Sequence, residues 1–81
     1  MQDYQKIKGE QKMTDKEKLF QILTAEERDN VEEMIHCSNS TDEWWVVYFK
    51  KDSTIYKKIG RRYSVRSFSE AKRVIYNLIK Y

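Results

Sequence analysis

The chain has 81 residues, of which 36% are charged, 40% hydrophobic and 14% aromatic, with two glycines and no proline. This length excludes two independent domains, and eleven aromatic residues exclude a chain too polar to build a core. No apolar run reaches the roughly 18 residues that span a bilayer, and the first twenty residues lack the apolar stretch of a signal peptide. The single cysteine cannot form an internal disulfide. We therefore expect a cytoplasmic protein with no membrane segment. We also expect residues 13–81 to form one domain after a mobile tail of residues 1–12.

The net charge of +3 results from two halves of opposite sign. Residues 1–43 contain eleven acidic and six basic residues, a net charge of −5, whereas residues 44–81 contain ten basic and two acidic residues, a net charge of +8. Such asymmetry is typical of a surface that binds a polyanion or another partner, or of two halves that pair with each other.

The N-terminal part of the chain repeats one helical signature. Thr14 precedes Glu17, and Thr24 precedes Glu27, at the spacing of a capping box, in which a hydroxyl and a carboxylate satisfy backbone N–H groups. An apolar stripe with helical spacing follows each box, so the sequence predicts a helical hairpin. The predicted stripes are Leu19, Ile22 and Leu23 within a helix over residues 14–23, and Val31, Met34 and Ile35 within a helix over residues 25–37.

The composition then changes toward β-branched and aromatic residues. Residues 38–42 are polar residues that favour a connector. The run that begins at Trp44 favours strands, with turn residues at 51–54 and a break at Gly60. The predicted strands of an antiparallel sheet are residues 44–49, 54–59 and 62–67.

A C-terminal helix is predicted by the same signature as the first two. Ser67 and Glu70 form a third capping-box spacing, and the apolar residues after them recur at helical intervals as far as Ile79. The sequence therefore predicts an α+β fold, with an N-terminal helical hairpin, a three-stranded antiparallel sheet and a C-terminal amphipathic helix.

Alternation along the predicted strands divides their side chains between two faces. One face would pack on the C-terminal helix, and the other would combine basic and aromatic side chains. The predicted core face carries Trp45, Val47, Phe49, Ile55, Ile59, Tyr63 and Val65, and the opposite face carries Trp44, Val46, Tyr48, Lys50, Tyr56, Lys58, Arg62, Ser64 and Arg66.

Three arrangements of this second face remain open. If the N-terminal helices pack on it, its aromatic residues belong to the core and the acidic helix neutralises part of the basic sheet. If they do not, Lys and Arg can contact phosphates while aromatic rings stack on bases. A protein partner or a second copy of the chain, held through Trp44, Val46 and Tyr48, is the third arrangement.

Several familiar sites are not indicated. The predicted second helix carries five acidic residues, which phosphates would repel, so it is not the reading helix of a helix-turn-helix. His36 and Cys37 have no further His or Cys to complete a metal site, and neighbours on a helix diverge too far for a nucleophile and its base. We interpret His36 and Cys37 as the end of the predicted second helix. We expect a non-enzymatic protein without catalytic residues, metal or cofactor.

The basic run offers the candidate binding residues. Five basic side chains fall within ten residues around the predicted second turn of the sheet, where they can contact phosphates. We expect a small nucleic-acid-binding or regulatory protein; the alternative is a protein-interaction module, an inhibitor or adaptor, that uses its acidic helices or apolar sheet face. The candidate residues are Lys50, Lys57, Lys58, Arg61, Arg62 and Arg66 for phosphates, with Tyr48 and Tyr56 for stacking.

Residues 43–81 also carry a family resemblance. Three strands followed by an amphipathic helix, with Trp45, Tyr48, Lys57-Lys58, Arg61 and the phrase Ser67-Phe68-Ser69-Glu70-Ala71, resemble the arm-type DNA-binding domains of tyrosine recombinase integrases. This resemblance implies a sheet that enters the major groove, and it fits an accessory protein of a phage or mobile element. It would place Lys58, Arg62, Ser64 and Arg66 against the DNA.

Overall fold

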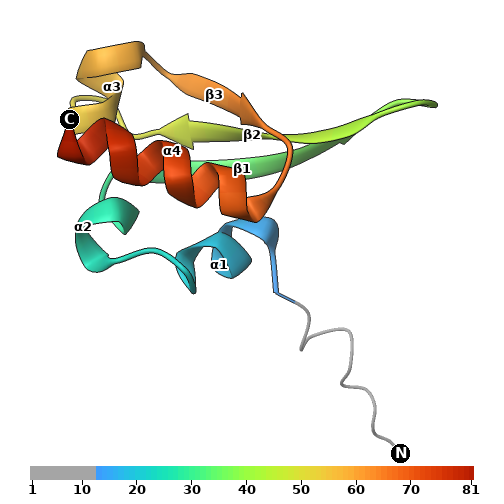
Figure 1. The fold of residues 1–81 in the computed structure, drawn as a ribbon, viewed down its shortest axis with the longest axis horizontal. Coiled ribbons are helices and arrows are strands. Elements are labelled where there is room, and N and C mark those ends of the chain that lie inside the picture. Colours follow the sequence, from blue (N-terminus) through green and yellow to red (C-terminus); the bar gives the residue numbers. More distant parts are fainter. Residues whose placement is uncertain (1–12) are drawn as a thin grey trace, which may run out of the picture.

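The computed structural model describes residues 13–81, so the predicted tail of residues 1–12 lies outside the described residues (Figure 1). The described part has the predicted α+β class, with helices, a three-stranded antiparallel sheet and a C-terminal helix. In chain order the elements are α1 (Asp15–Phe20), α2 (Ala25–Arg28), β1 (Val31–Ser38), β2 (Glu43–Phe49), α3 (Thr54–Ile59), β3 (Arg62–Val65) and α4 (Phe68–Lys80).

The three strands follow one another in the sheet in the order β1-β2-β3, so β2 is central. Val47 of β2 lies between Met34 of β1 and Tyr63 of β3. Helix α4 runs across one face of the sheet, and α1, α2 and α3 all contact α4 (Figure 1). The helices of residues 13–81 therefore lie on one side of the sheet, and none of them covers its other face.

The core fills the space between the sheet and α4. Leu19 of α1 and Ile75 of α4 are fully buried there, together with residues from β2 and α3. Of the predicted core face, Val47, Phe49, Ile55 and Val65 are buried and Trp45 packs against them.

Two members of the predicted core face are not buried. Ile59 is 39% exposed because it is the last residue of a helix and not part of a strand. Tyr63 is 42% exposed because β3 is an edge strand with a neighbour on one side only.

The predicted helix over residues 25–37 is wrong after its first turn. Its capping box is present, since the Glu27 N–H donates to Thr24 Oγ1 and the Thr24 N–H donates to Glu27 Oε1. Helix α2 nevertheless ends at Arg28, and strand β1 begins at Val31. The register of β1 shifts between Val31 and Glu33, which is the mark of a β-bulge. The bulge buries Val31 and Met34, three positions apart, and so imitates the spacing of a helix.

The predicted strand over residues 54–59 is also wrong, because these residues form helix α3. Ser53 caps this helix, with its side-chain oxygen accepting the Tyr56 N–H at 3.2 Å. Gly60 ends the helix with φ 97°, a conformation that glycine adopts without steric cost. The third strand of the sheet is instead β1, and predicted strand 62–67 appears as β3.

Helices α1 and α4 agree with the prediction, although α1 ends three residues early. The Thr14–Glu17 capping box is complete. At α4, Ser67 Oγ accepts the Glu70 N–H, but the Glu70 carboxylate accepts the Arg66 N–H at 2.7 Å instead of returning to Ser67. Within residues 13–81, no helix is both long and apolar enough to cross a bilayer.

A buried ion pair joins α2 to α4. Lys72 Nζ lies 2.6 Å from Glu27 Oε1, and the Glu27 side chain is only 4% exposed. Burial alone raises the pKa of Glu27, but the hydrogen bonds from Lys72 and from the Thr24 N–H outweigh it and hold the pKa below 4.5. The charged carboxylate therefore stabilises the fold at neutral pH, and this contribution is lost as the pH falls through the range below 4.5.

We predict that Lys72→Met lowers the free energy of unfolding at pH 7 by about 1–2 kcal/mol, a modest loss because Lys72 is one-third exposed. Thermal unfolding followed by circular dichroism from pH 7 to about pH 3 measures this effect. The variant should lose less stability than the native protein on acidification. Equal acid sensitivity of the two proteins would contradict the role of this pair.

Candidate functional site

The sheet face that carries no helix is a candidate surface, and we call it the open face. Side chains alternate along a strand, so every second residue of β1, β2 and β3 points to this face. The strand registers arrange these residues in rows that run across the sheet. The rows are Glu33–Tyr48–Arg62, Ile35–Val46–Ser64 and Cys37–Trp44.

The open face is apolar in its middle. Trp44, Val46 and Tyr48 along β2 are half-buried, and Ile35 of β1 is 45% exposed. The N-terminal helices do not cover these residues, because α1 and α2 pack with α4 on the opposite side (Figure 1). The arrangement in which those helices bury the aromatic residues of this face is therefore wrong.

Opposite charges flank the apolar middle of the open face. On the β3 side, the Arg61 guanidinium lies 5.4 Å from the centre of the Tyr48 ring, a cation–π contact, and Arg62 follows it. On the β1 side lie Glu32 and Glu33, which with Tyr48 and Arg61 line one pocket. The face is thus acidic along one edge and basic along the other.

The connection from β2 to β3 concentrates the positive charge, and we call residues 50–62 the basic excursion. It contains six basic residues and one acidic residue, a net charge of +5. No acidic side chain of residues 13–81 forms an ion pair with it, because the ion pairs of this part of the chain involve other cations. The basic residues are Lys50, Lys51, Lys57, Lys58, Arg61 and Arg62.

Some of the predicted site residues come together and others do not. Tyr48, Arg61 and Arg62 are neighbours on the open face, and Lys50 and Lys57 are exposed in the basic excursion. The remaining three predicted contacts lie elsewhere.

Lys58 turns away from the sheet, and its Nζ donates a hydrogen bond to the Leu78 carbonyl of α4. The resemblance to integrase arm domains placed Lys58 on the sheet, and this placement is wrong because residue 58 belongs to α3. Tyr56 is half-buried and packs against the core, so its ring is not an open stacking surface.

Arg66 lies beyond the other end of β3, where it is paired within the molecule. Its Nη1 lies 2.6 Å from Asp42 Oδ1. The Glu43 N–H and the Arg66 guanidinium hold the pKa of Asp42 below its ordinary value. Asp42 is therefore charged at neutral pH and neutralises Arg66.

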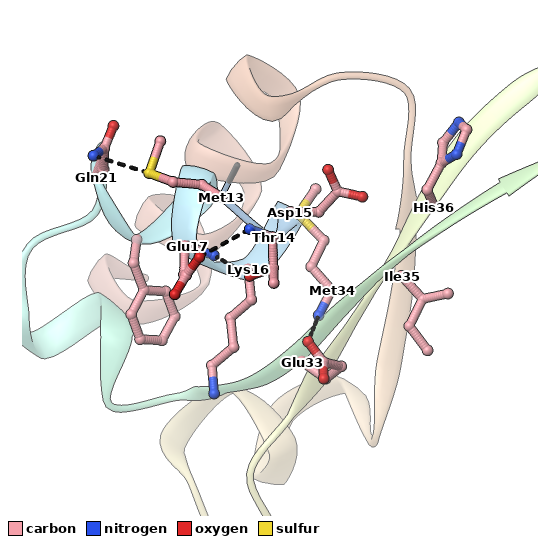
Figure 2. Close-up of a pocket in the computed structure, with 11 residues that line it drawn as sticks. Met13, Thr14, Asp15, Lys16, Glu17, Gln21, Glu33, Met34, Ile35 and His36 are labelled. Carbon is pink, nitrogen blue, oxygen red and sulfur yellow. Dashed lines mark hydrogen bonds between the residues drawn. The ribbon is translucent and has the colours of Figure 1, made fainter. Parts of the chain in front are cut away.

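Figure 2 shows a pocket between α1 and the outer edge of β1, where the Glu33 side chain binds the backbone of Met34. The Met34 N–H points away from β2, and Glu33 Oε1 accepts it at 3.0 Å. Edge strands expose unpaired backbone groups that recruit other strands, and a charged side chain placed there prevents this. The Glu33 carboxylate thus protects the free edge of β1.

His36 and Cys37 lie in strand β1, so their expected position at a helix end is wrong. They point to opposite faces, as neighbours on a strand do. His36 Nε2 lies 3.0 Å from Glu43 Oε2, and its ring is 5.1 Å from that of Trp45 on the helix-covered side. Both residues therefore have structural neighbours and do not converge on each other.

The sequence did not indicate that Glu32, Glu33 and Ile35 belong to the open face. The helical spacing of the apolar residues placed them on a helix. The β-branched residues Val31 and Ile35 were the signal in favour of a strand.

Comparison of the chain with known protein families, curated proteins and solved structures finds no match.

Proposed function

We propose that this protein binds nucleic acid through the basic excursion, as an accessory or regulatory protein without an enzymatic activity of its own. The observation that carries the proposal is the net charge of +5 within residues 50–62, without an acidic partner in residues 13–81. Unpaired Lys and Arg side chains bind phosphates largely by releasing condensed counterions.

Four side chains are the main phosphate contacts in this proposal. Lys50, Lys57, Arg61 and Arg62 are exposed, whereas Lys58 is engaged by a backbone carbonyl. The Tyr48 ring beside Arg61 supplies a stacking surface next to these charges, as in proteins that bind single strands. Contacts of this kind favour binding that depends little on base sequence.

The open face supports a second candidate, a protein-interaction module. Glu32 and Glu33 lie on the same face as Tyr48 and would repel a phosphate backbone there. Ile35 and Val46 lie between the charged edges, and an apolar centre with a polar rim is the usual anatomy of a protein interface. Arg61 and Arg62 belong to both surfaces, so the variants that separate the two candidates change Lys50 and Lys57, which lie outside the paired rows of the open face.

The test of nucleic-acid binding reverses two charges of the excursion that lie outside the paired rows of the open face. The Lys50→Glu/Lys57→Glu variant should bind a fluorescent 20-nucleotide strand or duplex at least about tenfold more weakly than the native protein, as measured by anisotropy at low salt. The matched control, Lys18→Glu/Arg73→Glu, changes the net charge equally at exposed positions of α1 and α4. If the control loses as much affinity, or the native protein does not bind, the proposal is wrong.

A further inference from the structure

We infer that the open face binds a second copy of this chain, so that two sheets stack face to face about a two-fold axis parallel to β2. The inference rests on how the rows of the open face are ordered across the sheet, and it requires no nucleic acid. A rotation about β2 exchanges the two edges of the sheet, so β1 of one copy lies over β3 of the other.

Charge complementarity supports this axis. Glu33 and Arg62 lie on either side of Tyr48 in one row. The rotation brings Glu33 of each copy opposite Arg62 of the other, so the same ion pair forms twice, through the Glu33 oxygen that does not accept the Met34 N–H of its own chain. A two-fold interface must be self-complementary in this way.

Side-chain size matches in the next row. Ile35 on β1 is large and 45% exposed, and Ser64 at the corresponding place on β3 is small and exposed. The rotation places each Ile35 opposite a Ser64 of the other copy, so a protruding side chain meets a gap. Val46 lies between them, on the axis, and meets its own copy.

The alternative two-fold axis, perpendicular to the strands through Val46, is less complementary. It would place β1 on β1 and bring Glu33 opposite Cys37, which leaves the acidic and basic edges without partners. Stacked sheets pack about 10 Å apart with their strands rotated by about 30°, so the match is best near the axis. In the proposed binding of nucleic acid, the axis along β2 also places Lys50 and Lys57 of both copies at the same end of the dimer, while Arg62 is engaged by Glu33 of the other copy.

A charge-swap experiment tests the dimer. Analytical ultracentrifugation over about 1–200 μM should show a concentration-dependent dimer of the native protein. Glu33→Arg and Arg62→Glu should each raise the dissociation constant at least about tenfold, and the double variant should recover most of this loss. Arg73→Glu, a reversal at an exposed position of α4, should leave the dimer unchanged.

A second variant keeps the test decisive if a charge swap disturbs folding. Val46→Lys places two like charges together on the axis, so it should abolish the dimer while the circular dichroism spectrum stays native. A native protein that stays monomeric at all concentrations contradicts the inference, as does a dimer that Val46→Lys leaves intact. The Lys50→Glu/Lys57→Glu variant leaves the paired rows of this face unchanged and should still dimerise, so failure of the dimer and failure of nucleic-acid binding are distinguishable.

Discussion

Replacing Phe49 with alanine is expected to lower the free energy of unfolding by about 3–5 kcal/mol. Phe49 is 1% exposed and is the largest of the fully buried side chains among the described residues. Its removal leaves a cavity between the sheet and the helices, and partial collapse of the core cannot fill it. A domain of this size has a total stability of about 5–10 kcal/mol, so most of it would be lost. Urea unfolding followed by circular dichroism measures the change.

Tyr48→Ala is the matched control for Phe49→Ala. Tyr48 is the preceding residue of β2 and points to the open face, where it is half-buried. Its replacement should cost only about 1 kcal/mol when measured at a low protein concentration. If Tyr48→Ala were as destabilising as Phe49→Ala, the assignment of the two faces of the sheet would be wrong.

Asn30→Ala is expected to lower the free energy of unfolding by about 2–3 kcal/mol. Asn30 is 5% exposed and joins three segments of the chain. Its Oδ1 accepts the Ile55 N–H, its Nδ2 donates to the Glu26 carbonyl, and its own carbonyl accepts the Lys50 N–H. Alanine would leave the buried Ile55 N–H without a partner, which is costly in a protein interior.

Two further variants test whether the buried hydrogen bonds of Asn30 are what stabilises the fold. Asn30→Asp keeps an oxygen for the Ile55 N–H but places a buried carboxylate against the Glu26 carbonyl, so at pH 7 it should be at least as destabilising as Asn30→Ala. Asn39→Ala removes an exposed side chain that caps the hairpin turn and should cost less than about 1 kcal/mol. Equal losses for Asn39→Ala and Asn30→Ala would show that the buried hydrogen bonds do not hold the segments together.

The elements that local chemistry determines could be predicted from the sequence. Capping residues and apolar spacing identified α1 and α4, and the aromatic, β-branched run identified β2. The class of the fold followed from these elements. Each of these signals acts within a few residues of the chain, so it can be detected without knowledge of the tertiary contacts.

The elements that depend on tertiary contacts could not be predicted in the same way. The bulge in β1 places the buried Val31 and Met34 three positions apart, and only pairing with β2 distinguishes this strand from a helix. Thr54–Ile59 has strand-forming residues but is helical, because Ser53 caps it and Asn30 binds its second residue from 25 positions away. Ser53 and Gly60 were the local signals for this helix.

The candidate site was predicted in part for the same reason. Alternation along β2 correctly grouped Trp44, Val46 and Tyr48 on one face. The acidic edge of that face was missed, because Glu33 was placed on a helix. Similarly, Lys58 was expected on the sheet but points to α4, because its segment is a helix whose side chains follow a different period.

The salt dependence of nucleic-acid binding tests the central claim of phosphate recognition by the basic excursion most directly. At a protein concentration too low for the dimer, four contacts from one chain, Lys50, Lys57, Arg61 and Arg62, should give a slope of about −3 to −4 in a plot of log affinity against log salt for duplex DNA. Affinity should then fall about 100-fold between about 50 and 200 mM salt, and the slope for Lys50→Glu/Lys57→Glu should be shallower by about 2. Binding whose affinity does not change over this range, or no binding at the lowest salt, would contradict the claim.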